Sequence, residues 1–298
     1  MKKLILLLTV LFGAVNMSAQ DNDIQEEEVL VKVEKDGKYG FVDKSGKVVI
    51  PFIYDWANDF KDGLAMVVKD GKDADSNNEY GFVDKSGKVV IPLIYDGAGN
   101  FKDGLAKVSK SGKYGFIDKS GKAVIPLIYD DVLDYDDVVD EIHEKDDNDR
   151  AYFEEGLLKV RKDDKCGLID RSGKVVIPII YDDIYNSAKR FYFNDGLAKV
   201  SKDGKCGLID KSGNLVVPCI YAGIKDFMDG LAIVWVSKDD SKLRLYIQKY
   251  GLIDKSGKVV VPLIYDDMFI KDIERGLLNV RKDGKSYVID KSGKVVTQ

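Results

Sequence analysis

The chain has 298 residues, of which 45% are hydrophobic, so it is long enough and apolar enough to bury a large core. Charged residues make up 33% of the chain, and the formal net charge is −5. Because a nucleic-acid-binding protein needs a basic face, this balance argues against a nucleic-acid partner.

Residues 1–19 are typical of a secretory signal peptide. A basic start, Lys2-Lys3, precedes an apolar run over residues 4–15, and Met17-Ser18-Ala19 ends in a small residue suited to cleavage. That run is shorter than the roughly 20 residues that span a bilayer, and no later stretch is long enough, so we expect no transmembrane segment. We expect cleavage after Ala19, a secreted or periplasmic protein, and a disordered lead-in over residues 20–28.

One phrase recurs along the rest of the chain. It first reads Tyr-Gly-Phe-Val-Asp-Lys-Ser-Gly-Lys-Val-Val-Ile-Pro-Phe-Ile-Tyr-Asp, over residues 39–55. Close versions begin at Tyr80, Tyr114, Cys166, Cys206 and Tyr250, and a shortened version begins at Ser286. Self-similarity at intervals of this size is the signature of a repeat architecture, so we predict a single repeat domain over residues 29–298.

Each repeat unit is predicted to contain three strands joined by two tight turns. In the third unit the strands are Leu105 to Val108, Tyr114 to Asp118 and Val124 to Tyr129. The first turn is an Asp-Gly or Ser-Gly pair between two apolar alternating runs, which is a strong hairpin signal because glycine accepts a positive φ. The second is Asp-Lys-Ser-Gly, in which the Asp opens a type I turn and the Gly takes a left-handed conformation.

A proline stands at one fixed point of the third strand in six units. These prolines are Pro51, Pro92, Pro126, Pro178, Pro218 and Pro262. Proline cannot donate a hydrogen bond to a neighbouring strand, so it is confined to edges, strand ends and bulges. We therefore expect the third strand to be the outer strand of its unit, or to bend at the proline.

These patterns predict an all-β protein made of seven tandem three-stranded antiparallel units. The middle strand is apolar on both faces, which indicates that units pack against one another. An open β-solenoid is the preferred arrangement, because no unit is split between the two ends of the repeat array. A closed β-propeller remains the alternative.

The repeated phrase, followed by Tyr-Asp and then Phe-x-x-Gly-Leu-Ala-x-Val, resembles the bacterial WG-repeat (KWG-like) family. The resemblance covers residues 29–298 in seven tandem matches. The tryptophan that names the family is Tyr in four units, Cys at Cys166 and Cys206, and Ser at Ser286. The resemblance implies repeated β-units and supplies no catalytic motif to carry over.

Several groups of acidic residues are candidates for chemistry. The Asp-Lys/Arg-Ser-Gly turns offer one carboxylate and one hydroxyl each, too few for Ca²⁺, so we interpret them as hairpin turns. The Asp-Asp pairs Asp130-Asp131, Asp182-Asp183 and Asp266-Asp267 recur at one slot, so we interpret them as caps for backbone N–H groups of the linker turn. The acidic insert over residues 130–150 carries eleven acids against two basic residues, and we interpret it as a solvated loop, with cation or basic-partner docking as the alternative.

Histidine, cysteine and tyrosine give no catalytic set. The single histidine, His143, lies in the acidic insert, where the fixed geometry of a general base is not expected. The three cysteines are interpreted as buried free thiols, with a Cys166–Cys206 bridge as the alternative. Ten of the sixteen tyrosines fall in two repeat slots, which favours a core between units over a sugar-binding platform.

The sequence therefore predicts a non-enzymatic exported protein that binds or scaffolds an envelope protein or a glycan. No catalytic residue, metal ligand or cofactor is predicted, and neither the binding residues nor the oligomeric state can be assigned. The alternative is a hydrolase that acts on cell-surface polymers through loop carboxylates.

Overall fold

The computed structural model describes residues 29–69, 78–133, 152–153, 155–185, 192–240, 245–272 and 275–297. The predicted signal peptide, the predicted lead-in, His143 and residues 134–150 of the acidic insert lie outside this part of the chain. Within it, the protein is all-β and forms seven small antiparallel sheets, one for each repeat unit. The prediction of seven antiparallel units is confirmed.

Three strands of each unit correspond to the three that the sequence predicts. The first strands are β1 (Val31–Lys35), β5 (Leu64–Lys69), β9 (Leu105–Lys110), β13 (Leu157–Lys162), β17 (Leu197–Lys202), β21 (Leu231–Asp240) and β25 (Leu277–Lys282). The second strands are β2 (Lys38–Val42), β6 (Glu79–Asp84), β10 (Lys113–Asp118), β14 (Lys165–Asp170), β18 (Lys205–Asp210), β22 (Leu245–Asp254) and β26 (Lys285–Ile289). The third strands are β3 (Val48–Tyr54), β7 (Val89–Tyr95), β11 (Ala123–Tyr129), β15 (Val175–Tyr181), β19 (Leu215–Tyr221), β23 (Val259–Tyr265) and β27 (Val295–Thr297).

A fourth, short strand corrects the prediction of three-stranded units. It comes from the segment that was expected to be a linker, and it pairs with the outer side of the first strand in units 2 to 7. These short strands are β4 (Trp56–Ala57), β8 (Gly97–Ala98), β12 (Asp131–Leu133), β16 (Asp183–Tyr185), β20 (Gly223–Ile224) and β24 (Asp267–Asp272). Most are only two or three residues long, which is too short for an alternating pattern to appear in the sequence.

The first turn is a two-residue hairpin in units 1, 3, 4, 5 and 7, as predicted, whereas the paired residues that flank it are further apart in the sequence in units 2 and 6. Lys35 pairs with Lys38, and the two residues between them, Asp36 and Gly37, have φ values of 53° and 75°. Two successive positive φ angles define the type I′ turn, whose twist matches that of the flanking strands. In unit 4 the second turn position is Asp164, which adopts a φ of 60° without the freedom of glycine.

The third strand bulges at its proline and lies at one edge of its sheet. In unit 3, Tyr114 pairs with Tyr129 and Phe116 pairs with Ile125, so two steps along β10 face four steps along β11. The extra residues surround the proline, where no backbone donor is available. The sheet order β11-β10-β9-β8 places the third strand outermost, so both halves of the proline prediction are confirmed.

The bulge explains the glycine that follows the Tyr or Cys of each phrase. A Cβ added to Gly115 would lie 2.6 Å from the Ile125 carbonyl oxygen and 2.9 Å from the backbone of the next two residues. In unit 7 this position is Tyr287, and there β27 ends before the bulge would begin. A side chain is therefore excluded at this position of the second strand only in units whose third strand continues into the bulge.

The cores lie between units rather than within them. At the junction of units 3 and 4, Phe116, Ile125 and Tyr129 of one unit pack against Leu158 and Val160 of the next. Five further clusters repeat this arrangement at the other junctions of the described chain. Because each unit buries its apolar face only against its neighbours, the packing is that of a repeat array.

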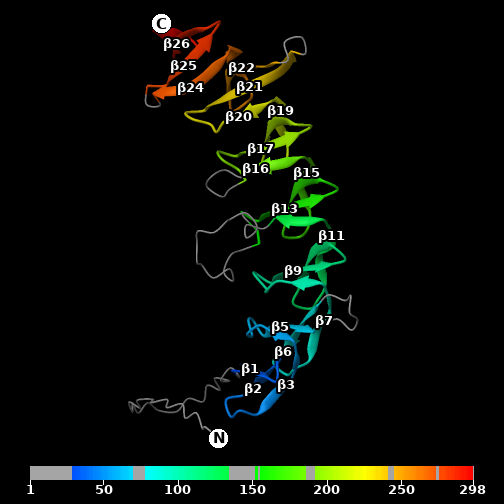
Figure 1. Cartoon of the computed structure of the whole chain (residues 1–298). Coiled ribbons are helices and arrows are strands. Elements are labelled where there is room, and N and C mark those ends of the chain that lie inside the picture. The colour runs from blue at the N-terminus through cyan, green and yellow to red at the C-terminus, as the bar shows by residue number, and fades with distance from the viewer. Residues whose placement is uncertain are drawn as a thin grey trace, which may run out of the picture.

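Figure 1 shows the sheets following one another in an elongated row, with the first sheet, β1 to β3, at one end and the last sheet, which contains β24 to β26, at the other. The third strands β3, β7, β11, β15 and β19 lie along one side of the row.

Candidate functional site

The carboxylates of the Asp-Lys/Arg-Ser-Gly turns are occupied by the turns themselves. Asp118 Oδ1 accepts hydrogen bonds from the Ser120 backbone N–H at 2.9 Å, the Ser120 hydroxyl at 2.6 Å and the Lys122 N–H at 3.1 Å. The serine hydroxyl bond is the main reason why the pKa of Asp118 lies below its ordinary value. Equivalent bonds recur in the other units, so the interpretation as hairpin turns is confirmed.

The first residue of each Asp-Asp pair links neighbouring units. Asp182 accepts from Lys165 Nζ at 2.6 Å and from the Gly204 N–H at 3.1 Å, and Gly204 belongs to the first hairpin of the next unit. Asp130 and Asp266 make the corresponding bonds. The lysine bond is the main cause that lowers the pKa of each of these three carboxyls. The predicted backbone cap is present, but on the following hairpin rather than on the linker turn.

The second residue of the pair caps the linker, as predicted. Asp183 Oδ1 accepts from the Ile184 N–H at 2.9 Å, and Asp267 Oδ1 accepts from the Met268 N–H at 2.9 Å. Asp183 also pairs with Lys159 of the preceding unit. These carboxylates therefore hold the chain in place between one sheet and the next.

A ladder of exposed ion pairs connects successive units. The acid of the turn before a first strand pairs with the basic residue of the Asp-Lys/Arg-Ser-Gly turn one unit later. The pairs are Asp62–Lys119, Asp103–Arg171, Glu155–Lys211, Asp195–Lys255 and Asp229–Lys291. Exposed pairs of this kind each contribute about 0–1 kcal/mol to the free energy of unfolding. The ladder therefore contributes more to the relative placement of neighbouring units than to the stability of the protein.

The cysteines and the second set of tyrosines belong to the junction cores. All three cysteines are free; Cys166 is buried, whereas Cys206 and Cys219 are half-buried. Burial raises the pKa of each thiol, which disfavours the reactive thiolate. The six tyrosines that precede the linker are buried, namely Tyr54, Tyr95, Tyr129, Tyr181, Tyr221 and Tyr265. The core interpretation of these six is confirmed, while the tyrosines before glycine are half-buried.

A ridge of exposed apolar side chains runs along the third strands, and sequence reasoning missed it. In the second half of these strands the proline and the second residue after it are exposed in all six bulged units. The exposed isoleucines of this strand-three ridge are Ile53, Ile94, Ile128, Ile180, Ile220 and Ile264, at 39–54% exposure. The sequence did contain a signal for this ridge, because the third strands are apolar on both faces and were expected at a sheet edge. Such a strand exposes apolar side chains on one face unless another element covers it.

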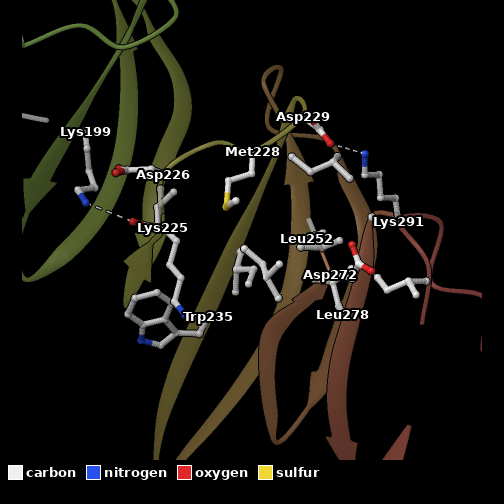
Figure 2. Close-up of a pocket in the computed structure, with 16 residues that line it drawn as sticks. Lys199, Lys225, Asp226, Met228, Asp229, Trp235, Leu252, Asp272, Leu278 and Lys291 are labelled. Atoms are coloured by element: carbon white, nitrogen blue, oxygen red, sulfur yellow. Dashed lines mark hydrogen bonds and ion pairs between the residues drawn. The ribbon is translucent and has the colours of Figure 1, made fainter. Parts of the chain in front are cut away.

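A cavity of about 520 Å³ opens at the junction of units 6 and 7. Its walls are mainly apolar and include Ile233 and Trp235 of β21, Leu252 of β22 and Leu278 of β25 (Figure 2). The Trp235 ring stacks on Tyr250 at a centroid distance of 5.8 Å. The ring has room because Gly223 lies opposite it in β20, where an added Cβ would lie 1.9 Å from the indole.

Charged groups surround this cavity and bind one another or the backbone. Lys291 Nζ lies 2.7 Å from Asp229, and Lys199 Nζ lies 3.3 Å from the Ile224 carbonyl oxygen (Figure 2). Asp272 accepts a hydrogen bond from the Arg275 N–H at 3.1 Å. The cavity is therefore an apolar space with three basic and three acidic side chains along its lining, namely Lys199, Lys225, Lys291, Asp226, Asp229 and Asp272.

The described residues contain neither a metal-binding cluster nor a membrane-spanning helix. No three His, Cys, Asp or Glu side chains within the described ranges are grouped so as to hold a metal ion. In the same part of the chain, no helix has the length and apolar character needed to cross a membrane.

Comparison with protein families gives one match, to the model described as a WG containing repeat. The match covers residues 39–72, 80–114, 114–137, 167–206, 207–238 and 250–285. No curated protein matches the chain in sequence.

Three of the solved structures that align with the chain have low TM-scores. A eukaryotic initiation factor is 10% identical, with 90% of this chain and 84% of that chain covered and a TM-score of 0.29. The extracellular domain of a hybrid two-component system from B. thetaiotaomicron is 10% identical, with 91% and 42% covered and a TM-score of 0.27. A puromycin hydrolase is 11% identical, with 90% and 51% covered and a TM-score of 0.27. Scores this low establish no function for the chain.

Proposed function

The chain belongs to the family of WG-containing repeat proteins, and we propose that it is a non-enzymatic exported protein that binds or scaffolds an envelope component along its length. The observation that carries this proposal is the strand-three ridge. The same exposed side chains recur at the same slots of six consecutive units, and they lie on strands whose outer edge pairs with no other strand of the described chain. A repeated surface of this kind suits a partner that is itself extended.

We further propose that the array is an open β-solenoid rather than a closed propeller. The separation of the first and last sheets in Figure 1 supports this arrangement, as does the packing of each sheet against the sheets before and after it. In an open array the ridge forms one long, continuous line, whereas in a closed ring the same residues would be distributed around a central axis.

A protein partner is favoured over a glycan. The ridge consists of aliphatic side chains and proline, and apolar surface of this kind marks protein interaction sites. The six buried tyrosines are not available as a platform for sugar rings.

The alternative, a hydrolase acting through loop carboxylates, is disfavoured by how these carboxylates are used. Asp130, Asp182 and Asp266 each accept from a lysine and from a backbone N–H of the next unit. A carboxylate held in this way has a lowered pKa and is a poor general acid at neutral pH.

The test is affinity capture from envelope extracts with two matched triple variants. The ridge variant carries Ile94→Gln, Ile128→Gln and Ile180→Gln, three exposed positions whose change should leave the fold intact. The control carries Lys88→Gln, Lys122→Gln and Lys174→Gln, which are exposed turn residues of the same three units. A partner captured by the wild type and the control but lost with the ridge variant supports the proposal. Equal capture by all three proteins, or turnover of a polysaccharide that stops when Asp182 is replaced, contradicts it.

A further inference from the structure

The outer strand of the last unit, β24, is longer than the corresponding strands of units 2 to 6. It contains six residues, whereas β4, β8, β12, β16 and β20 contain two or three. On one side β24 pairs with β25, and on the other side it pairs with no strand of the described chain. Figure 1 shows it at an outer margin of the last sheet, near one end of the row. An edge strand of this length presents backbone groups that can pair with another chain.

The strand β24 exposes apolar side chains and carries no proline. Phe269 and Ile270 are 49% and 39% exposed, whereas Met268 is buried in the junction core. The third strands have a proline and a bulge at the opposite edge of each sheet, and both features prevent regular pairing there. In β24 the register with β25 is regular from Asp267 to Ile270 and shifts only after Ile270. The edge of β24 is therefore suited to pairing, in contrast to the edge of the third strands.

The backbone of β24 determines which of its residues can pair with a second strand. The Met268 N–H donates to the Asp267 carboxylate at 2.9 Å, so it points away from β25. The next residue points the other way, because Gly99, at the same slot of unit 3, donates its N–H to the Lys107 carbonyl oxygen of the adjacent strand at 2.8 Å. Backbone groups alternate in direction along an antiparallel strand, so Met268 and Ile270 direct theirs to the open edge.

We propose that two copies of the chain pair through β24 as an antiparallel, two-fold symmetric dimer centred on Phe269. In this register Met268 of each copy exchanges two backbone hydrogen bonds with Ile270 of the other copy, and Phe269 faces Phe269. The charges also match, because Asp267 of each copy lies opposite Lys271 of the other copy. The neighbouring registers that the backbone allows, centred on Met268 or on Ile270, place a charged residue opposite Phe269 instead.

Pairing in this register gives one aromatic pair, two apolar pairs and two pairs of opposite charge. Cross-strand pairs of these kinds stabilise neighbouring antiparallel strands. When the strands pair, the Met268 N–H passes from the Asp267 carboxylate to the other copy, and the carboxylate is released to face Lys271. The same patch serves both copies, as a two-fold interface requires.

This inference goes beyond the proposed function and is independent of it. The third strands, which carry the ridge, lie at the opposite edge of each sheet from the short outer strands. A dimer formed through β24 therefore leaves both ridges uncovered.

Charge reversal tests the proposed register without changing the junction core. Asp267→Lys and Lys271→Asp each place like charges opposite one another, so each variant alone should dimerise less than the wild type. Each dimer holds two such pairs, and both change from attraction to repulsion, so the dissociation constant should rise about 4- to 900-fold. An equimolar mixture of the two variants should dimerise again, because opposite charges then face each other at both pairs.

Sedimentation equilibrium of the full chain over a range of concentrations measures the association, and circular dichroism establishes that each variant is folded. The matched control is Lys294→Asp, a charge reversal at an exposed turn residue of the same unit, which should dimerise like the wild type. The ridge variant with Ile94→Gln, Ile128→Gln and Ile180→Gln should also dimerise normally, which separates this inference from the ridge. The proposal is overturned if the wild type is monomeric at every concentration, if either charge variant alone dimerises as tightly as the wild type, if their mixture stays monomeric, or if the control or the ridge variant fails to dimerise.

Discussion

Replacing Gly115 by alanine tests the account of the bulge in the third strand. The added Cβ would lie 2.6 Å from the Ile125 carbonyl oxygen, 2.9 Å from the Pro126 carbonyl carbon and 2.9 Å from the Leu127 nitrogen. Favourable contacts between carbon atoms lie near 3.5–4.0 Å, so β10 and the bulge of β11 must separate by more than half an ångström. All three atoms belong to backbone, and no side chain can move aside to relieve the clash.

The expected cost of Gly115→Ala is about 3 kcal/mol of the free energy of unfolding, the upper part of the range for overpacking. The matched control is Gly104→Ala. Gly104 has a φ of 82° but nothing within 4 Å of an added Cβ, so this change should cost only the left-handed strain of alanine, about 1–2 kcal/mol. Urea denaturation followed by circular dichroism measures both values. The reasoning is refuted if Gly115→Ala is no more destabilising than Gly104→Ala, since steric exclusion by the bulge would then be absent.

Three further predictions concern a turn, a set of carboxylates and a thiol. Asp164→Gly should stabilise the protein by about 1 kcal/mol, because Asp164 holds a φ of 60° where other units carry glycine; an unchanged urea midpoint would contradict this. The pKa of Asp118 is lowered in the folded protein, so its contribution to stability is present above the ordinary Asp pKa of 3.8 and is lost as the pH falls through the lower folded value. Urea midpoints should therefore decrease below about pH 4, and less steeply for Asp118→Asn, which cannot titrate; parallel curves for the two proteins would argue against this. Cys166 is buried with a raised pKa, so a thiol reagent such as Ellman's should label it only at the rate of unfolding, and labelling as fast as that of a free thiol in native buffer would exclude this packing.

The turns were predictable because their chemistry is local. Asp36-Gly37 requires two positive φ angles in succession, and a short polar residue followed by glycine is the pair that adopts them at least cost. The Asp-Lys-Ser-Gly turn closes on itself through Asp118, Ser120 and Lys122, all within five residues. No distant contact is needed for either turn, so the pattern of residues was sufficient.

The fourth strand and the partner of each linker aspartate were not predictable in the same way. The pairing of Gly97 with Ser109 depends on where the linker returns across the first strand, and two residues carry no period. Asp182 is adjacent to a linker in the sequence, yet its hydrogen bond reaches Gly204 in the next hairpin. The sequence showed that this residue has a structural role but not which backbone group it satisfies.

The candidate surfaces depended even more on tertiary structure. The cavity beside Trp235 is lined by Ile233, at a first-strand slot that holds lysine in units 3 to 5. That difference is unremarkable in the sequence. The open space appears only when units 6 and 7 are placed against each other.

By itself, the sequence determined that the chain is a β-repeat with seven units, where its turns fall and why proline stands at a strand edge, because φ preferences and missing donors act within a few residues. The sequence also indicated that the units pack against one another, but only the tertiary structure decided that one face of the third strands remains exposed and that the last junction leaves an open space. These features follow from how neighbouring units stack, since burial and cavity volume depend on atoms that are far apart along the chain.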